Sequence, residues 1–478
     1  MDTESAPPAT RAPILELARP VVDEIEHRFD DHLATIVAIL RQRSVSADGG
    51  DMEAMAGMLA GMLRALGART EILSTPGFPV VLGEIDEGAP RTIVVYGMYD
   101  TMPVEGETWI VDDPFAGQTV DLPGIGPSIV ARGAENSKGA LGAWLNMLAT
   151  WRSVHGRFPV NMRFVFEGEE ELGSPSLPAV IERHRDRLAG DAAVSPSLLQ
   201  GRTGKPVLRL GFKGIAFYEL AVRGGAWGGP TKRAVHSSRA VWYHSPAVTL
   251  AQALSSLVSS DQRQILIDGF YDEVAGVPAE DRHVLELLAG TFDPAIELAE
   301  DDVLRFKWDE NDIRLLERYL YQPSLSIDGL SAGDMGGGAK TILPHEARAK
   351  LEFRFVPNQR EEDLTERLLA HFVKAGFPQV EVRLHSTTKW SKTSVSSLAA
   401  RSSIAACRAF GLEPEVWPTQ AGSSPMYLFT DVLGLPFVSA GLGHGGGAHA
   451  SDEYATIEGL RLCEQSLAVF LAEFATGT

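Results

Sequence analysis

Apolar residues recur with two different spacings along the chain, and the alternation of these spacings predicts the fold class. Between residues 14 and 43 they return every three or four positions, which is typical of an amphipathic helix. β-Branched runs at 80–85 and 92–96 instead predict strands. Strands and helices then alternate, which favours an α/β fold with a doubly wound, mainly parallel sheet. Further strands are expected at 128–131 and 161–166, and helices at 52–66, 140–151 and 177–187.

The pattern changes after residue 212 and returns to its first form from residue 391 onward. We therefore expect a discontinuous catalytic domain of residues 1–212 and 388–478, interrupted by a smaller α+β lid or dimerisation domain at residues 213–387. In the inserted part we expect strands at 216–222, 347–356 and 380–385, helices at 245–256 and 360–376, and helix-like acidic segments within 262–320.

The apolar strand expected at 161–166 runs directly into four carboxylates, Glu167, Glu169, Glu170 and Glu171. Ligands of open α/β sheets bind beyond the carboxyl ends of the strands. Repulsion between neighbouring carboxylates is relieved by cations, protons or water. The cluster therefore indicates a functional site, although a solvated acidic turn is the alternative that this stretch alone leaves open.

Charge and cysteine content narrow the class of protein. A formal net charge of −20 argues against nucleic acid and anionic membrane as partners. The two cysteines, Cys407 and Cys463, predict no disulfide framework and fit a reducing cytoplasm. Residues 1–13 lack the apolar core of a signal peptide, and no apolar run approaches the length of a membrane span. We therefore expect a cytoplasmic protein.

Several short motifs follow one another along the chain in a recognisable order. They are Tyr96-Gly-Met-Tyr-Asp-Thr-Met-Pro103, Arg132-Gly-Ala-Glu-Asn-Ser-Lys-Gly139, Glu167-Gly-Glu-Glu-Glu-Leu-Gly-Ser174, His236-Ser237, Arg354-Phe-Val-Pro357, Ala421-Gly-Ser-Ser-Pro425 and His449-Ala-Ser-Asp-Glu-Tyr454. In this order they resemble the zinc-dependent amide hydrolases that include carnosinase, carboxypeptidase G, acetylornithine deacetylase and succinyl-diaminopimelate desuccinylase. The resemblance extends over nearly the whole chain.

The resemblance implies a two-metal site with five protein ligands, of which this chain retains only some. Glu171 falls on a carboxylate ligand and His449 on the last histidine ligand. Met98 stands where the first histidine is expected, and Asn136 where the bridging aspartate is expected. Pro196 lies where the remaining acidic ligand is expected. Three of the five ligand positions are therefore replaced.

The replacements change what the site is expected to hold. A neutral Asn136 is a weaker bridge than a carboxylate, and the Met98 thioether prefers soft cations. We therefore expect at most one divalent metal, zinc or manganese, on Glu171 and His449, with Glu135 or Asp100 as a third ligand, or no metal at all. Hydrogen bonding of Asn136 to Glu171 or His449 is expected in preference to coordination, and Met98 is expected to fill core space.

The same resemblance assigns catalytic roles. Glu170 falls on the general base, which would take a proton from the attacking water and pass it to the leaving amine. In the family the residue at Asp100 orients a ligand histidine; without that histidine, we expect Asp100 to pair with Lys138 or Arg132. His236 would stabilise the oxyanion, and in such proteins it often comes from a second subunit.

Substrate binding is inferred from the lid and from the closing loops. Arg354 would clamp a substrate carboxylate, and Ser423, Gly422 and Gly446 would add hydroxyl and backbone N–H donors. We therefore expect a small-molecule substrate with a carboxylate. The lid motif, again by resemblance, implies a homodimer formed through the lid domain.

Three functions remain open from the sequence. The first is hydrolysis of an amide bond in a small amino-acid derivative, a dipeptide or an N-acyl amino acid. The second is a metal-independent reaction on the same scaffold: proton abstraction, isomerisation or elimination. The third is a binding protein without catalysis, which the retained Glu170 disfavours because burying an unneeded carboxylate costs stability. We favour hydrolysis.

Overall fold

The computed structural model describes residues 15–201 and 204–477 and divides into two compact units. The first unit runs to Leu210 and resumes over Lys392–Pro418 and from Pro425 onward. The second comprises Gly211–Ser391 and Thr419–Ser424. The segment 1–13 and Ile14, with which the first helix was expected to begin, lie outside the described residues.

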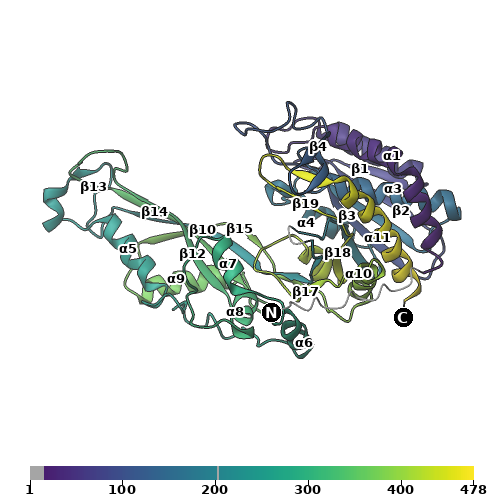
Figure 1. The fold of residues 1–478 in the computed structure, drawn as a ribbon. Coiled ribbons are helices and arrows are strands. Elements are labelled where there is room, and N and C mark those ends of the chain that lie inside the picture. Colours follow the sequence, from purple (N-terminus) through teal and green to yellow (C-terminus); the bar gives the residue numbers. More distant parts are fainter. Residues whose placement is uncertain (1–14, 202–203, 478) are drawn as a thin grey trace. The chain divides into compact units, whose positions relative to one another are not determined.

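A six-stranded sheet forms the centre of the first unit, in the order β1-β2-β6-β3-β7-β18 (Figure 1). The four strands β6, β3, β7 and β18 run parallel, whereas β1 and β2 add an antiparallel edge. The predicted α/β fold with a mainly parallel sheet is thereby confirmed. The strands are β1 (Arg69–Leu73), β2 (Val80–Ile85), β3 (Thr92–Met98), β6 (Asn161–Glu167), β7 (Ala192–Pro196) and β18 (Phe437–Ala440).

Both faces of this sheet are covered. Phe166 and Leu141 fill the space beside Gly97 on one face. The neighbouring residue Tyr96 points to the opposite face, where its ring contacts Phe429. Helices α1, α3 and α11 lie side by side over the first face (Figure 1). The helices of this unit are α1 (Arg19–Arg41), α2 (Met52–Ala65), α3 (Lys138–His155), α4 (Leu177–Arg183), α10 (Leu398–Ala409) and α11 (Ile457–Thr476).

A small separate sheet, β19-β20-β5-β4, joins segments from the two ends of the first unit. Its strand β5 (Gly126–Val130) pairs antiparallel with β20 (Tyr454–Thr456). The sequence predicts this segment as part of the alternation that builds the main sheet, so its observed partner differs from the prediction. The pairing brings the loop after β5 next to the loop before β20. The other strands are β4 (Gln118–Leu122) and β19 (Gly445–Gly446).

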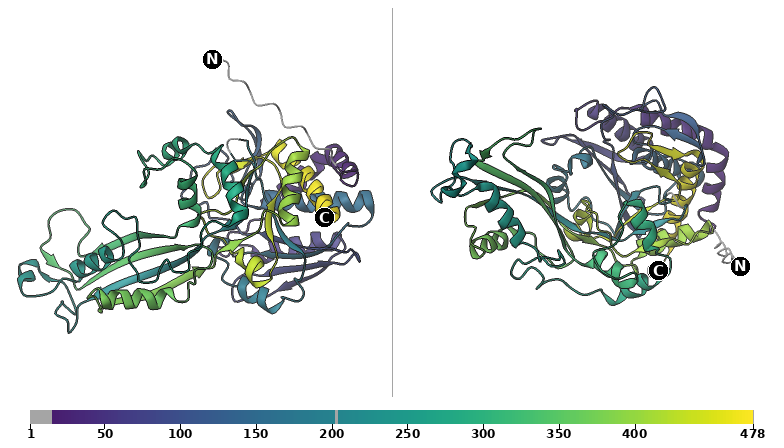
Figure 2. Two further views of the ribbon diagram at one scale, coloured as in Figure 1. Left: turned by 90° about the horizontal axis from the view of Figure 1, so that it is seen from below. Right: turned by 60° about the vertical axis from the view of Figure 1, so that its left-hand side comes forward.

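A four-stranded antiparallel sheet, β12-β14-β10-β15, forms the second unit, and α5 and α9 pack against it (Figure 2). Along β14 residues alternate between buried and more exposed, so one face carries apolar residues and the other Arg348, Lys350, Glu352 and Arg354. Strand β12, at one edge, was not anticipated. The bounds are β10 (Gly214–Arg223), β12 (Ser324–Ala332), β14 (Glu346–Phe355), β15 (Val380–Thr388), α5 (Pro246–Ser256) and α9 (Leu364–Lys374).

Shorter elements complete the two units. Cys407 and Cys463 are buried and free. Within residues 15–201 and 204–477, no helix has the length and apolar character needed to cross a membrane. The remaining elements are η1 (Glu170–Leu172), β8 (Val207–Arg209), β9 (Gly211–Phe212), β11 (Val235–His236), η2 (Ser237–Val241), α6 (Ala279–Ala289), α7 (Pro294–Glu300), α8 (Ile313–Tyr321), β13 (Ile342–Leu343), β16 (Ser391–Lys392), β17 (Glu415–Trp417) and η3 (Leu428–Val432).

Candidate active site

Two neighbouring parallel strands deliver the acidic residues to one place. Met98 at the end of β3 lies opposite Glu167 at the end of β6. Two residues beyond Met98, the fully buried Asp100 accepts hydrogen bonds from the backbone N–H groups of Glu170 (3.2 Å) and Glu171 (3.0 Å). Asp100 therefore holds the turn that carries Glu170 and Glu171 beside the end of β3.

The expected pairing of Asp100 with Lys138 or Arg132 is wrong. Lys138 Nζ instead donates to the carbonyl oxygen of Gln42 (2.7 Å), near the end of α1. The Arg132 guanidinium pairs with Glu453 (3.0 Å) and is also fully buried. Backbone N–H groups satisfy a buried carboxylate without a cation, because each is a strong donor.

Glu453 organises the loop that follows β5. One of its oxygens accepts from the backbone N–H of Gly133 (2.9 Å) and from Arg132 Nη1 (3.0 Å). The other accepts from the backbone N–H groups of Glu135 (2.9 Å) and Asn136 (2.8 Å). A single buried side chain thus sets the path of residues 133–136 and directs Asn136 into the site.

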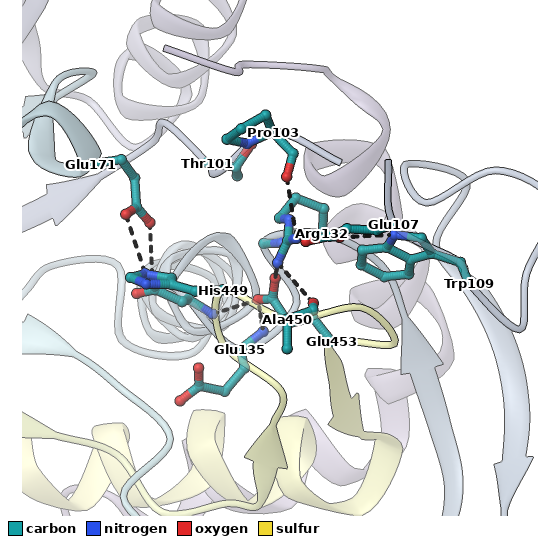
Figure 3. Close-up of polar contacts among 12 residues, drawn as sticks. Thr101, Pro103, Glu107, Trp109, Arg132, Glu135, Glu171, His449, Ala450 and Glu453 are labelled. Carbon is teal, nitrogen blue, oxygen red and sulfur yellow. Dashed lines mark hydrogen bonds and ion pairs between the residues drawn. The ribbon is translucent and has the colours of Figure 1, made fainter. Parts of the chain in front are cut away.

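Arg132 connects this loop to the segment after β3 (Figure 3). Its Nη2 donates to Glu107 Oε2 (2.9 Å) and to the carbonyl oxygen of Pro103 (3.3 Å), and its Nη1 also donates to the carbonyl oxygen of Ala450 (3.1 Å). The guanidinium carbon lies 5.1 Å from the centre of the Trp109 ring. Such a cation–π contact adds to the fixation of a buried Arg.

Asn136, Glu171 and His449 meet in one cluster, in which Glu171 and His449 point toward one another (Figure 3). Asn136 Nδ2 donates to Glu171 Oε1 at 2.8 Å and lies 2.9 Å from His449 Nε2. The same His449 nitrogen lies 3.2 Å from Glu171 Oε2. The Glu171 side chain is 5% exposed and that of His449 54% exposed, so the cluster opens to solvent on the histidine side.

This donor set does not fit the two-metal site that the resemblance implies. Met98 is buried at the end of β3, and Pro196 pairs in register with Ala440 inside the sheet. The side chain of Glu135 extends toward Gly445, and its carboxylate points away from Glu171 (Figure 3). Among the residues that the structure describes, no group of three or more His, Cys, Asp or Glu side chains is arranged to hold a metal ion.

Burial sets the protonation of the cluster. It raises the pKa of Glu170 to about 7, with the nearby Asp100 carboxylate adding to the shift. Burial and the carboxylates of Glu170 and Asp100 raise the pKa of Glu171 to about 8. Burial and the positive charge of Arg132 lower the pKa of His449. The acids of the site therefore exchange protons near neutral pH, the range in which general acid–base catalysis is effective.

Glu167, the last residue of β6, is a further buried acid directly before the turn that carries Glu170 and Glu171. Glu167 is 1% exposed, and its Oε1 accepts hydrogen bonds from the hydroxyls of Tyr96 (2.7 Å) and Ser174 (2.9 Å). Burial raises the pKa of Glu167 to about 8. These hydrogen bonds fix the end of β6 directly before the turn that carries Glu170.

The residues predicted to bind substrate or to stabilise the oxyanion contact groups other than Glu171, Asn136 and His449. In the second unit, Arg354 Nη1 donates to Ser423 Oγ (3.0 Å), while Arg354 Nε pairs with Glu352 (2.9 Å). His236, also in the second unit, is exposed, and its Nε2 lies 3.1 Å from the Thr341 hydroxyl. The carbonyl oxygen of Gly422 accepts from the backbone N–H of Lys213 (2.9 Å). Gly446 belongs to β19 in the first unit and lies beside the Tyr454 ring.

Sequence reasoning gave no role to two side chains on which the site depends. Glu453 lies only four residues after His449, within the motif already singled out, and the sequence does not distinguish it from the neighbouring Asp452. Glu167 is one of four closely spaced acids, and the sequence does not distinguish it from the others, whereas the structure buries it as the last residue of β6. Arg132 was considered only as a partner of Asp100.

Comparisons with known proteins agree with these motifs. The model of peptidase family M20/M25/M40 matches residues 94–473. The Cys-Gly metallodipeptidase of Schizosaccharomyces pombe is 27% identical, over 91% of this chain and 92% of its own. The Beta-Ala-His dipeptidase of Rattus norvegicus is 28% identical, over 76% of this chain and 75% of its own.

A solved structure leads to the same family. The M20 family metallo-carboxypeptidase of Sulfolobus solfataricus superimposes with a TM-score of 0.83 at 32% identity, covering 93% of this chain and 99% of that one. The resemblance inferred from the motifs is thus confirmed. The chain belongs to peptidase family M20/M25/M40 and is an amidohydrolase of the peptidase type.

Proposed function

We propose that this chain hydrolyses the amide bond of a dipeptide or an N-acyl amino acid, with Glu170 as the general base. The observation that carries the proposal is the placement of Glu170: Asp100 holds its backbone N–H at 3.2 Å, on the turn that also bears Glu171 of the Glu171–Asn136–His449 cluster. Two similar proteins are named for the dipeptides Cys-Gly and β-Ala-His. They suggest the substrate class.

In the proposed reaction Glu170 accepts a proton as a water oxygen attacks the carbonyl carbon of the substrate. The C–N bond then breaks, and Glu170 returns the proton to the departing amine nitrogen; the carboxylic acid and amine so formed are a carboxylate and an ammonium ion at neutral pH. A carboxyl group whose pKa burial raises to about 7 can perform both transfers near neutral pH. The neighbouring Glu171 and His449 would orient the water and the carbonyl group.

We place recognition of a substrate carboxylate on Arg354. Glu352 accepts from Arg354 Nε and Nη2 and Ser423 from Arg354 Nη1, which fixes the guanidinium and leaves one hydrogen each on Nη1 and Nη2 to donate to a substrate carboxylate. His236 is proposed to stabilise the oxyanion. We further propose a homodimer formed through the second unit, because its edge strand β12 exposes Ile327 (46%) and Leu330 (55%).

The proposal is tested by incubating the purified chain with Cys-Gly and with β-Ala-His and measuring the free amino acids that are released. Replacing Glu170 with Gln removes the proton acceptor at nearly constant shape, and we expect kcat to fall about 10²–10⁴-fold. Glu169→Gln is the matched control. Its carboxylate belongs to the same motif but packs against Gly77.

Equal losses in the Glu169→Gln and Glu170→Gln variants would contradict a specific base role for Glu170. Absence of amino-acid release from a broad dipeptide and N-acyl amino acid panel would reject hydrolysis. Size-exclusion chromatography with light scattering tests the dimer, which a monomer mass at assay concentration would refute.

A second function is favoured by the Asn136 amide, whose nitrogen lies within hydrogen-bond distance of both Glu171 and His449 where the resemblance implies a bridging carboxylate. In this alternative Glu170 abstracts a proton from carbon in an isomerisation or elimination. Incubation of the same substrates in D₂O, followed by NMR, separates the two functions. Loss of a C–H signal without cleavage would support the alternative, whereas cleavage with retention of that signal supports hydrolysis.

A further inference from the structure

We propose that Asn136 closes the metal position of this chain, so that its side-chain amide takes the place of a divalent cation between Glu171 and His449. The inference rests on the proposed function only for the identity of the site. It concerns cation binding and not turnover. It goes further than a site with fewer ligands, because it names Asn136 as the residue that prevents an ion from binding to Glu171 and His449.

The contacts of the amide nitrogen are those of a donor group. Nδ2 lies 2.8 Å from Glu171 Oε1 and 2.9 Å from His449 Nε2, the two atoms that would bind an ion. Zinc ligands lie about 2.0–2.2 Å from the metal. An ion at that distance from both atoms would face the N–H hydrogens of Asn136, and an amide nitrogen offers no lone pair to a cation.

Rotation of the amide would not remove this obstacle cheaply. Glu171 must be ionised to bind a cation, and the rotated oxygen would then face Glu171 Oε1 and replace a donor–acceptor pair with two acceptors. The backbone that carries this side chain is fixed as well, because Glu453 holds the backbone N–H groups of Asn136 (2.8 Å) and Glu135 (2.9 Å). The loop therefore keeps Asn136 against Glu171 and His449.

The other replaced positions supply no substitute ligand. The Met98 side chain is 7% exposed and carries a thioether, and Pro196 has no side-chain donor. One carboxylate and one imidazole then remain, whereas catalytic zinc sites use three protein ligands. The amide provides the order that a metal would otherwise give, since it fixes the distance between Glu171 and His449.

Isothermal titration calorimetry of the full chain tests the inference. Protein treated with chelator and then desalted is titrated with Zn²⁺ and, separately, with Mn²⁺. For the natural sequence we expect no site that takes up one ion per chain at concentrations up to about 1 mM. Asn136→Asp adds the missing carboxylate and is expected to create such a site. Its Zn²⁺ affinity should be at least about tenfold tighter than the 1 mM limit set for the natural sequence, and its melting temperature should rise on addition of Zn²⁺.

Asn358→Asp is the matched control, since it adds the same charge at an exposed position. A gain of binding in Asn136→Asp but not in Asn358→Asp supports the proposal. One ion per chain bound by the natural sequence and lost in His449→Ala would overturn it, and this comparison holds even if Asn136→Asp does not fold. Failure of dipeptide hydrolysis would overturn the proposed function while leaving the titration result unaffected.

Discussion

Replacing Glu453 with Gln is expected to loosen the loop that places Asn136 in the site. The two carboxylate oxygens accept four hydrogen bonds, from Arg132 Nη1 and from the backbone N–H groups of Gly133, Glu135 and Asn136, over 2.8–3.0 Å. Gln keeps one acceptor oxygen and replaces the other with an NH₂ group. Whichever way the amide turns, two donors then face a donor.

The magnitude follows from the charged character of these bonds. A hydrogen bond to a charged group contributes about 1.5–3 kcal/mol. Each factor of ten in an equilibrium corresponds to about 1.36 kcal/mol. If the variant lacks one such bond at an amide, local opening there costs less free energy, and hydrogen exchange of that amide should accelerate about 10–160-fold. The Gly133 amide, or those of Glu135 and Asn136, should change, depending on the orientation that Gln adopts.

Hydrogen–deuterium exchange with mass spectrometry of peptides that contain residues 133–136 measures this effect. Glu458→Gln serves as the control, because the Glu458 side chain is 70% exposed and lies on the same segment of the chain. Peptides from β2, in the main sheet of the same unit, report on unfolding of that unit as a whole. Unchanged exchange of residues 133–136 in the Glu453 variant would refute the conclusion that this carboxylate holds the loop.

Three further substitutions test other parts of the structure. Burial raises the pKa of Glu167 to about 8, so the stability that this group contributes is fully present below about pH 4.3 and is lost as the pH rises to 8. In urea titrations, the unfolding free energy of the Glu167→Gln variant should therefore fall less steeply with pH over this range, by up to about 1.4 kcal/mol per pH unit. An equal slope in the two proteins would contradict this prediction. Glu464 is fully buried and 2.6 Å from His32, so Glu464→Ala should cost about 3–5 kcal/mol in the same assay; a loss below about 1 kcal/mol would be inconsistent with a buried pair. Arg354→Lys should raise KM about tenfold for substrates with a free carboxylate but not for their amides, and equal effects on both would exclude carboxylate recognition.

The fold class could be predicted because local patterns determine it. Alternating apolar runs and helical spacing give parallel strands and covering helices, and these elements occur as expected in the main sheet. The partner of β5 could not be predicted in this way, because it lies more than 300 residues away in β20. Strand β12 was missed because it is an exposed edge strand with few buried residues, and the apolar pattern there is weak.

In the candidate site, too, contacts that follow from the chemistry of the side chains could be predicted, whereas those that depend on the path of the backbone could not. Asn136 was expected to hydrogen-bond to Glu171 or His449, and the structure contains both contacts. That expectation followed from chemistry, since an amide beside a carboxylate donates to it. The partners of Asp100 were wrongly expected to be cations. A sequence shows which charges exist, but it does not show that backbone N–H groups of a tight turn will face a buried acid.

Two buried carboxylates explain how protein groups alone hold the loops of the candidate site in place. Asp100 accepts from the N–H groups of the turn with Glu170 and Glu171, and Glu453 accepts from those of the loop with Asn136. Neither arrangement requires a cation in the cluster. We therefore expect substitutions at Met98 or Asn136 to leave in place the bonds that position the backbone of the cluster, whereas loss of Asp100 or Glu453 should displace the cluster itself.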